Sequence, residues 1–277
     1  MEIGVIHHIM PNEPGNMFRT VDEFGIRVCQ LFCGGDKLPA TREVAKRVIR
    51  DSREANVRVC AVWAGVPGIG FWNFTQGPVT LGLVPPDERS VKVQALKDWA
   101  DFASWIGAPA IITHCGFIPE NMTDPEFEPV VEAIREVALY CEQLGIDFWF
   151  ETGQETPIVL LRTIERVGTS NLGINLDPAN LIMYGKGNPI DALDVFGRYV
   201  RNVHVKDGLC PTNGDELGLE VRVGEGKVNF PLLLSKLRKL GYAGEFIIER
   251  EITGEEQQRD IRNTILDLQE WWSQLES

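Results

Sequence analysis

Eight short apolar segments recur along the chain, with segments of helical period between them. Each apolar segment is rich in Val, Ile, Phe or Trp, and its hydrophobicity is nearly continuous. Such segments are typical of parallel strands that are covered on both faces. The expected strands are residues 3–9, 26–32, 57–63, 110–116, 146–152, 172–178, 200–207 and 244–251.

The segments between the expected strands have apolar residues spaced for one face of a helix. Residues 40–57 place Val44, Val48 and Ile49 on one stripe, with charged residues opposite. The first connection is the weakest, because residues 16–25 leave room for only a short helix. The other expected helices are residues 90–108, 129–145 and 255–275.

The alternation of strand and helix predicts the fold. Repeated eight times, it indicates an α/β fold, a (β/α)8 TIM barrel formed as a single domain by residues 1–277. An open, doubly wound sheet is the rival arrangement, and it often carries a glycine-rich phosphate turn after its first strand. The first strand here ends in HHIMPNEPG, which contains no GxGxxG motif. We therefore expect the closed barrel.

Two of the connections that follow strands are long. Residues 64–87 are rich in Gly, Pro and aromatic side chains, and residues 208–228 follow the seventh strand. Connections after barrel strands lie on the active face, and long loops in compact domains tend to be functional. Surface excursions without a function are the alternative interpretation.

Composition and charge narrow the class of protein. Hydrophobic residues make up 44% of the chain and charged residues 24%, as in an ordinary globular domain. The formal net charge of −13 repels a phosphate backbone, so we expect no nucleic-acid partner. The sequence shows neither a signal-peptide pattern nor an apolar run of membrane-spanning length, so no membrane partner is expected.

Six cysteines are scattered through the sequence without a CxxC pair. We expect each to be a small buried hydrophobe, which favours a reducing, cytoplasmic location. They are Cys29, Cys33, Cys60, Cys115, Cys141 and Cys210.

The ends of the last four strands carry the candidate chemistry. A charged residue at the end of an apolar strand is costly to bury unless it is paired or bound to a metal. Neighbouring strands share one rim of a barrel, so the four side chains can converge, whereas four independent salt bridges would not explain the clustering. Three oxygen ligands and one nitrogen suit Mn²⁺, Mg²⁺ or Co²⁺, with Zn²⁺ as a further candidate. The proposed ligands of this one divalent ion are Glu151, Asp177, His204 and Glu249.

The motifs around these ligands resemble those of the xylose-isomerase-like barrels. The chain has LDPAN, HVKDG, VGEGKVNF and FIIERE in this order. The group includes ketose 3-epimerases, hydroxypyruvate isomerase, inosose-converting enzymes and apurinic-site endonucleases. The resemblance implies a TIM barrel, a single divalent metal held by the same four residues, and a small carbohydrate substrate. Homodimers or homotetramers are usual among similar barrels.

Two positions depart from the family pattern. The third residue after the strand-six Asp is commonly His in the epimerases and endonucleases, and here it is Asn180. An Arg commonly follows the strand-seven His in the epimerases. Cys210 occupies that region here, and the nearest candidate is Arg222.

Other polar and aromatic residues near the strand ends are candidates for contacting the substrate. Because neighbouring residues of a strand point to opposite sides, at most one of His7 and His8 faces the barrel interior. For each candidate a structural role is the alternative: a hydrogen-bonded core histidine, a packed tryptophan or a salt bridge at the rim. The candidate substrate-binding residues are Asn180, His114, Lys206, Arg222, Trp63, His7 and Glu155.

The expected mechanism is proton transfer next to a carbonyl. The metal would polarise the C=O, and removing the adjacent proton would give an enediolate. Glu151 and Glu249 would be the catalytic acid/base pair. Returning the proton to the same carbon is an epimerisation, and returning it to the neighbouring carbon is an isomerisation. The sequence does not choose between these two.

Three other functions compete with a sugar isomerase or epimerase. A metal-dependent dehydratase of a cyclic polyol could use the same residues. An apurinic-site endonuclease would need a multi-zinc cluster, and the chain has only four histidines. A barrel that senses a sugar without converting it has no need of two opposed carboxylates.

Overall fold

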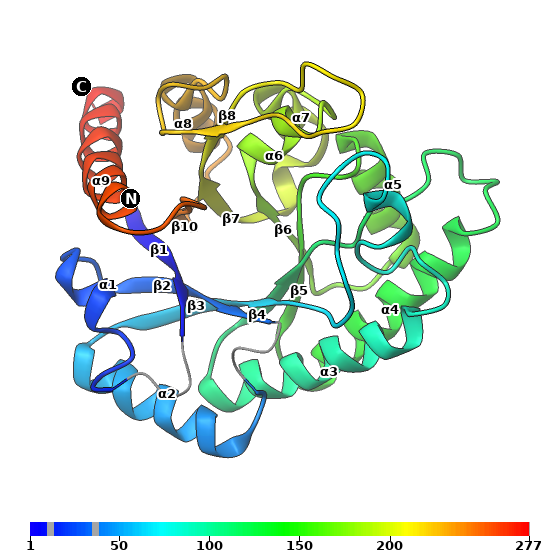
Figure 1. Cartoon of the computed structure of the whole chain (residues 1–277), viewed down its shortest axis with the longest axis horizontal. Helices are drawn as coiled ribbons and strands as arrows, with labels where there is room; N and C mark the ends of the chain where they lie inside the picture. The colour runs from blue at the N-terminus through cyan, green and yellow to red at the C-terminus, as the bar shows by residue number, and fades with distance from the viewer. Residues whose placement is uncertain (10–13, 35–38, 277) are drawn as a thin grey trace.

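The computed structural model describes residues 1–9, 14–34 and 39–276, and it contains the expected closed barrel of eight parallel strands (Figure 1). All eight strands lie inside or within one residue of the predicted segments. They are β1 (Glu2–His8), β2 (Val28–Cys33), β3 (Arg58–Ala64), β4 (Ala110–Thr113), β5 (Asp147–Glu151), β6 (Leu172–Leu176), β7 (Val200–Val205) and β10 (Glu245–Ile248). Around the barrel they follow chain order, and β10 closes the ring against β1.

Helices surround the barrel. In the part of the first connection that the structure describes lies the five-residue α1, a short helix as the length of this connection predicted. Helix boundaries follow local chemistry: Thr41 accepts a hydrogen bond from the Val44 amide at the start of α2, and Gly107 ends α3 at a φ of 75°. The helices are α1 (Arg19–Glu23), α2 (Arg42–Ala55), α3 (Arg89–Ile106), α4 (Phe127–Gln143), α5 (Pro157–Val167), α6 (Pro178–Met183), α7 (Pro189–Phe196), α8 (Phe230–Lys239) and α9 (Glu255–Glu276), with short 3-10 turns at Gly77–Val79 and Gly197–Tyr199.

The two long connections meet over the barrel. Within residues 207–221 the chain forms a small antiparallel pair, β8 (Asp207–Gly208) with β9 (Glu220–Val221). The amide of Phe74 donates to the carbonyl oxygen of Asp215 at 2.9 Å, so residues 64–87 are tied to residues 208–228. The connections after β3 and β7 therefore contact each other above the strand ends.

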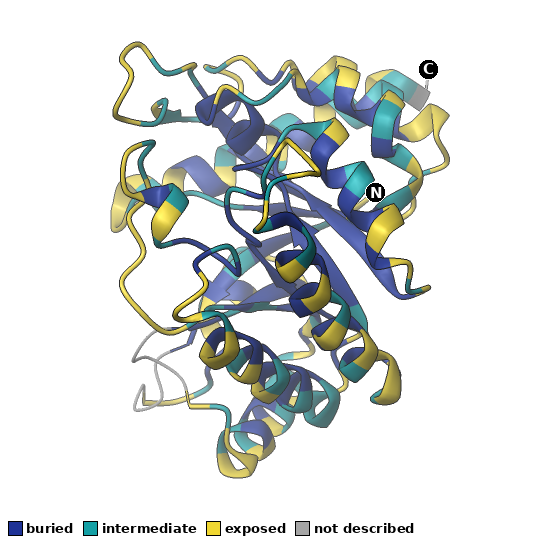
Figure 2. Ribbon diagram, turned by 90° about the vertical axis from the view of Figure 1, so that its right-hand side faces the viewer, coloured by how far each residue is buried: buried dark blue, intermediate teal, exposed yellow. Residues whose placement is uncertain are grey.

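The core separates into an outer shell and a barrel interior. Figure 2 shows the strands in the colour of buried residues and the outer helix faces in that of exposed ones. A large apolar cluster lies between strands and helices, and a smaller one contains Ala61, Ile112 and Trp149. Alternation along β5 puts Trp149 on the same side as Glu151, so this smaller cluster lies beneath the strand ends.

All six cysteines are free thiols, as expected from the absence of a paired framework, and five of them are buried. Cys210 is exposed, so the expectation that each cysteine is buried is wrong for this residue. Among the helices of the described residues, none combines the length and the apolar character needed to cross a bilayer.

Candidate metal centre at the barrel mouth

The four proposed ligands converge at one point. Each of the four offers a ligand atom, and these atoms all lie within 4.8 Å of one another. The His204 Nδ1 atom lies 3.0 Å from Glu249 Oε2 and 3.3 Å from Glu151 Oε1, and Asp177 Oδ2 is 3.7 Å away. The grouping matches the donor set of three oxygens and one nitrogen that the strand ends predicted.

Local structure points one oxygen of Asp177 at this centre. Asp177 caps α6, where its Oδ1 accepts from the Asn180 amide at 2.9 Å and Pro178 occupies the first turn. Thr152, next to Glu151, donates from its hydroxyl to the Asp177 carbonyl at 2.8 Å. Since Oδ1 is engaged in the cap, Oδ2 is the oxygen left to bind a cation.

A glutamine inside the barrel orients His204. The Gln30 Oε1 atom lies 2.8 Å from His204 Nε2, and the Gln30 amide nitrogen lies 3.5 Å from Oδ1 of both Asn175 and Asn202. Gln30 Oε1 can only accept, so Nε2 carries a proton and Nδ1 is the nitrogen that faces the carboxylates. Holding one imidazole nitrogen in this way is how proteins fix a metal-binding histidine.

Two buried atoms in the cluster make no hydrogen bond within the described residues: Asp177 Oδ2 and His204 Nδ1. Charged groups lie near both atoms, but not in hydrogen-bonding geometry. Buried polar atoms are rarely left in this state. One carboxylate oxygen and one imidazole nitrogen that face the same point fit a cation, so the residues present suit a metal ion.

The charges at the centre also fit a divalent cation. Lys206 Nζ lies 3.4 Å from Glu249 Oε2 and 3.5 Å from Asp177 Oδ2. Three ligand carboxylates and this one ammonium sum to a net charge of −2. Burial would raise the pKa of Glu249, but Lys206 and His204 outweigh burial and bring that pKa below its usual range. The glutamate is therefore ionised and able to bind metal at neutral pH.

A cavity of about 670 Å³ opens onto the centre. Glu151 and Glu249 line this cavity, whereas Asp177 and His204 do not and have no exposed surface. The cluster thus has an inner pair, Asp177 and His204, and an outer pair of glutamates that a small molecule in the cavity can reach.

Three of the predicted substrate-binding residues line the same cavity: Trp63, His114 and Asn180. All three also contact Glu151. The Trp63 indole N–H donates to Glu151 Oε2, and the Asn180 amide nitrogen and His114 Nε2 each lie 3.5 Å from Glu151 Oε1. Lys206 lies beside the ligands, as described above.

The other three predicted residues lie elsewhere. His8, not His7, lines the cavity, because His7 points the other way and its Nε2 lies 2.7 Å from the Met17 carbonyl oxygen. Arg222 pairs with Asp267 of α9 at 3.0 Å and is outside the cavity wall. The structure corrects the choice of His7 and Arg222 as cavity residues.

Glu155 is buried near the centre without lining the cavity. Neither of its carboxylate oxygens has a hydrogen-bond partner within the part of the chain that the structure describes. Burial raises the pKa of Glu155 to about 8, so the side chain is largely protonated at neutral pH. The position fits a buried neutral acid better than a direct contact with substrate.

Comparisons with known proteins identify the family to which this barrel belongs. A family model described as a xylose isomerase-like TIM barrel matches residues 18–274. The chain belongs to the xylose isomerase-like TIM barrel family. The crystal structure of a xylose isomerase domain protein from Planctomyces limnophilus is similar, with 34% identity and a TM-score of 0.91 over 99% of this chain and 98% of that one.

More distant members of similar fold carry names of sugar chemistry. The crystal structure of a D-tagatose 3-epimerase-like protein has 21% identity and a TM-score of 0.76, over 100% of this chain and 98% of that chain. The inosose dehydratase of Geobacillus kaustophilus is 24% identical over 147 residues, 48% of each chain. The chain aligns with 58% and 48% of the length of two curated relatives that it matches.

A motif shared with the xylose isomerase-like family, HVKDG with a later VGEG, has a structural explanation here. The buried Asp207 carboxylate accepts hydrogen bonds from the amides of Gly208, Gly224, Gly226 and Val228, at 2.9 to 3.1 Å. A Cβ at Gly226 would lie 2.0 Å from Asp207 Oδ1, so only glycine fits. The motif closes the loop after β7 beside the metal centre.

Several site residues were missed from sequence. Gln30, Asn175 and Asn202 each interrupt an apolar strand with an amide, and that interruption was an available signal. The aromatic residues Phe32 and Trp72 line the cavity, but nothing in the sequence separates them from core aromatics.

Proposed function

We propose that this protein is a divalent-metal-dependent sugar isomerase or epimerase that moves a proton next to a substrate carbonyl. One observation carries the proposal: the two glutamates of the ligand cluster line the cavity, while Asp177 and His204 lie wholly buried beneath them. An inner pair that only binds metal and an outer pair that also reaches the substrate is the arrangement that acid/base chemistry at a metal needs.

Glu151, Asp177, His204 and Glu249 would hold the metal, with Mn²⁺, Mg²⁺ or Co²⁺ suited to the oxygen-rich donor set. When bound, the ion supplies Lewis-acid chemistry, polarising a carbonyl and stabilising the negative charge that forms when the neighbouring carbon loses its proton. The remaining steps belong to the chain's own side chains.

Either of the two cavity glutamates can take up the proton, with the other returning it. Lys206 Nζ lies 3.4 Å from Glu249 Oε2 and helps to position that carboxylate beside the cavity. Glu151 receives the Trp63 indole N–H at Oε2, which fixes the plane of its carboxyl group. Asn180 and His114, within 3.5 Å of Glu151, can donate to substrate oxygens.

The test is solvent isotope exchange. Metal-loaded protein is incubated in D₂O with a panel of ketoses and keto-sugars, and mass spectrometry follows deuterium uptake at the carbon next to the carbonyl. Glu151→Gln and Glu249→Gln should each lose on the order of 10²-fold or more in exchange rate, because an amide cannot act as a base. Glu132→Gln, which changes an exposed glutamate of α4, is the matched control.

Two results would reject the assignment. Turnover without deuterium in the product would mean that the substrate hydrogen is conserved, as in a hydride shift. Near-normal exchange in either Gln variant would remove that glutamate from proton transfer, whatever its role in holding metal.

Dehydration is the second candidate, and the alignment with an inosose dehydratase favours it. A dehydratase begins with the same proton removal but then expels a hydroxyl group from the next carbon. The same incubation separates the two, because elimination gives a product lighter by one water, while epimerisation and isomerisation preserve the mass apart from deuterium.

A further inference from the structure

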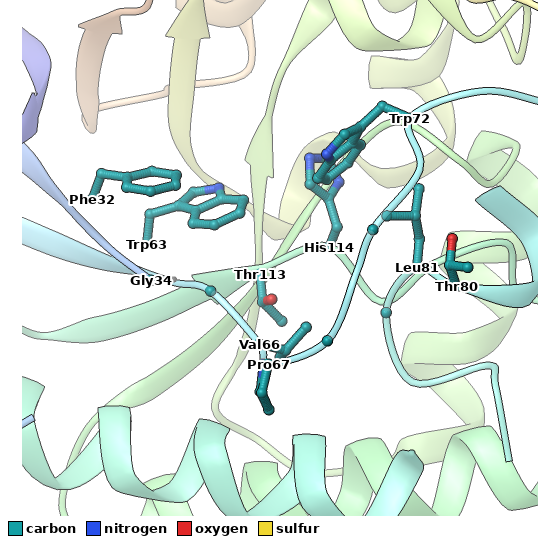
Figure 3. Close-up of a pocket in the computed structure, with 14 residues that line it drawn as sticks. Phe32, Gly34, Trp63, Val66, Pro67, Trp72, Thr80, Leu81, Thr113 and His114 are labelled. Atoms are coloured by element: carbon teal, nitrogen blue, oxygen red, sulfur yellow. The ribbon is translucent and has the colours of Figure 1, made fainter. Parts of the chain in front are cut away.

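A second cavity of about 310 Å³ adjoins the one at the metal centre. The two share part of their walls, namely Phe32, Trp63, Trp72 and His114. Figure 3 shows Phe32 and Trp63 side by side, with Trp72 and His114 across the space from them. We call this second space the aromatic cavity. Because its walls continue into those of the metal cavity, one molecule can occupy both.

The aromatic cavity has the chemistry of a site for an uncharged, flat group. Among its lining residues in the described chain, His114 is the only one with an ionisable side chain. The Thr113 hydroxyl is already used, since it donates to the Ala64 carbonyl at 2.9 Å. The metal cavity, by contrast, is lined by Glu151, Glu249 and Glu251. A carboxylate or phosphate is therefore unsuited to the aromatic cavity, whereas an apolar ring face suits it.

The rings are arranged as a platform and an edge. Phe32 and Trp63 are stacked, with centroids 4.5 Å apart and planes at 15°. Trp72 meets His114 edge-on at 5.2 Å and keeps 49% of its surface exposed. An exposed tryptophan in a polar-rimmed pocket is a common anchor for a ligand ring, because burying it on binding is favourable.

Closely packed backbone forms one wall of the aromatic cavity. Gly34 and Gly65 approach so closely that a Cβ on either would lie 2.7 Å from the Cα of the other, so no side chain can project there. The loop that carries Trp72 is held by the hydrogen bond from the Phe74 amide to Asp215. Trp72 is thus presented from an anchored loop.

We propose that the substrate is a glycoside of a keto-sugar, with the sugar ring that carries the carbonyl in the metal cavity and its second ring, which has a flat apolar face, in the aromatic cavity. The proposal rests on the proposed function for the position of the sugar. Trp63 fixes the relation between the two parts, since it lines both cavities and donates to Glu151. The second ring is an aromatic aglycone or the apolar face of another sugar, and both meet tryptophan through the same chemistry.

The test compares three ligands that share one glucose unit. Isothermal titration of the Mn²⁺-loaded protein measures the dissociation constants of methyl β-D-glucoside, phenyl β-D-glucoside and cellobiose. Phenyl glucoside or cellobiose should bind on the order of tenfold more tightly than methyl glucoside, because only these two place a ring in the aromatic cavity. The ligand that shows the higher affinity tells whether the second ring is an aromatic aglycone or another sugar.

Two variants test whether the gain in affinity arises in the aromatic cavity. Trp72→Ala, and Val66→Phe, which fills the aromatic cavity from another wall, should both bring the affinity ratio of the favoured ligand to methyl glucoside close to one. Phe71→Ala is the matched control, since Phe71 is 39% exposed on the same loop and lines neither cavity. Using the ratio cancels any general loss of sugar binding.

Equal affinity for the three glycosides, no measurable binding of any of them, or a ratio that survives both Trp72→Ala and Val66→Phe would overturn the proposal. These outcomes are separate from the deuterium test, which uses free keto-sugars and needs no second ring. A tenfold gain for phenyl glucoside together with no deuterium uptake by any keto-sugar would keep the aromatic cavity and reject the proton-transfer function. Deuterium uptake by a keto-sugar together with equal affinity for the three glycosides would do the reverse.

Discussion

The two halves of the barrel mouth differ in what their strands place at the rim. From β1 to β4 the side chains that reach the cavity are rings: His8, Phe32, Trp63 and His114. The ends of β5, β6, β7 and β10 carry the ligand cluster, Glu151, Asp177, His204 and Glu249, of which the two glutamates reach the cavity. The backbone is the same eightfold repeat in both halves. Strand-end residues alone therefore divide one rim into a surface for contact and a centre for chemistry.

The halves also differ in how they are stabilised. The rings of the first half pack on one another, as Phe32 does on Trp63. The second half buries charge, which is costly unless partners surround it. Those partners are Lys206 and Gln30, and the proposed cation would add a further one at Asp177 Oδ2 and His204 Nδ1, which make no hydrogen bond within the described residues. Bound metal should therefore stabilise the second half. Trp63 links the two halves, because it stacks on Phe32 and donates a hydrogen bond to Glu151.

The largest effect is expected from removing the imidazole ligand. His204→Ala should lower the affinity for Mn²⁺ by more than the 10- to 100-fold that outer-shell partners contribute. In the unmodified protein, metal at 100 times its dissociation constant adds about 2.7 kcal/mol of stability and raises the melting temperature by on the order of 5 °C. Differential scanning fluorimetry with and without Mn²⁺ should show that rise vanish in His204→Ala.

Elemental analysis provides the companion measurement. Purified wild-type protein should hold about one divalent ion per chain, because the described residues contain one such cluster of ligands. An unchanged metal content in His204→Ala would exclude this histidine from the site. A content of three zinc ions would favour the nuclease alternative instead.

The second effect concerns the buried acid Glu155. Its pKa is raised by burial from an ordinary 4.5 to about 8 in the folded protein. Between these two pH values the folded protein keeps a proton that the unfolded chain has released, so stability falls as pH rises through this window. Glu155→Gln stays neutral and should lack this fall. The difference in unfolding free energy between wild type and variant should change by on the order of a few kcal/mol from pH 4.5 to pH 8.

Urea unfolding at several pH values measures that difference. Glu120→Gln, which changes an exposed glutamate in the connection between β4 and α4, should show no such trend. If the unfolding free energies of Glu155→Gln and wild type changed in parallel from pH 4.5 to pH 8, Glu155 would be ionised in the folded protein and would have a partner that the hydrogen bonds do not reveal.

The third effect comes from the glutamine that holds His204. Gln30→Leu removes the acceptor at Nε2 without placing a charge inside the barrel. Loss of such a partner typically lowers metal affinity by 10- to 100-fold. Competition with a chelating dye measures the Mn²⁺ affinity. Gln30→Glu, which restores an acceptor, should recover part of the loss, whereas an equal loss in both variants would mean that repacking of the barrel, not the hydrogen bond, is responsible.

Much of this architecture could be predicted from sequence because apolar periodicity and strand parity are local properties. The eight strands followed from runs such as residues 146–152, and the ligand set followed from charged residues at the ends of such runs. Parity correctly allowed only one of His7 and His8 to face the cavity, but the choice of His7 was wrong, because pattern alone does not say which face of the first strand turns inward. The packing of Met17 against His7 decides it.

Contacts between distant segments could not be predicted in the same way. The pairing of Gln30 with His204 joins residues far apart in sequence, and the hydrogen bond from Phe74 to Asp215 joins two loops without a pattern of their own. Arg222 looked close to the site by sequence distance from His204, yet its partner Asp267 holds it against α9. In each case tertiary geometry, not local propensity, sets the position of the side chain.

The smallest effect is expected where the two halves are most separate. Trp72→Ala should leave Mn²⁺ affinity within about twofold and stability within about 0.5 kcal/mol, since its ring is half exposed and has no contact with a ligand atom in the described structure. Trp63→Phe keeps a ring for stacking on Phe32 but removes the N–H that Glu151 accepts, so it should weaken Mn²⁺ binding several-fold. The same dye competition measures both. If Trp72→Ala weakened metal binding as much as Trp63→Phe, the division of the rim into a contact half and a chemical half would be wrong, because aromatic packing itself would then be holding the ligands in place.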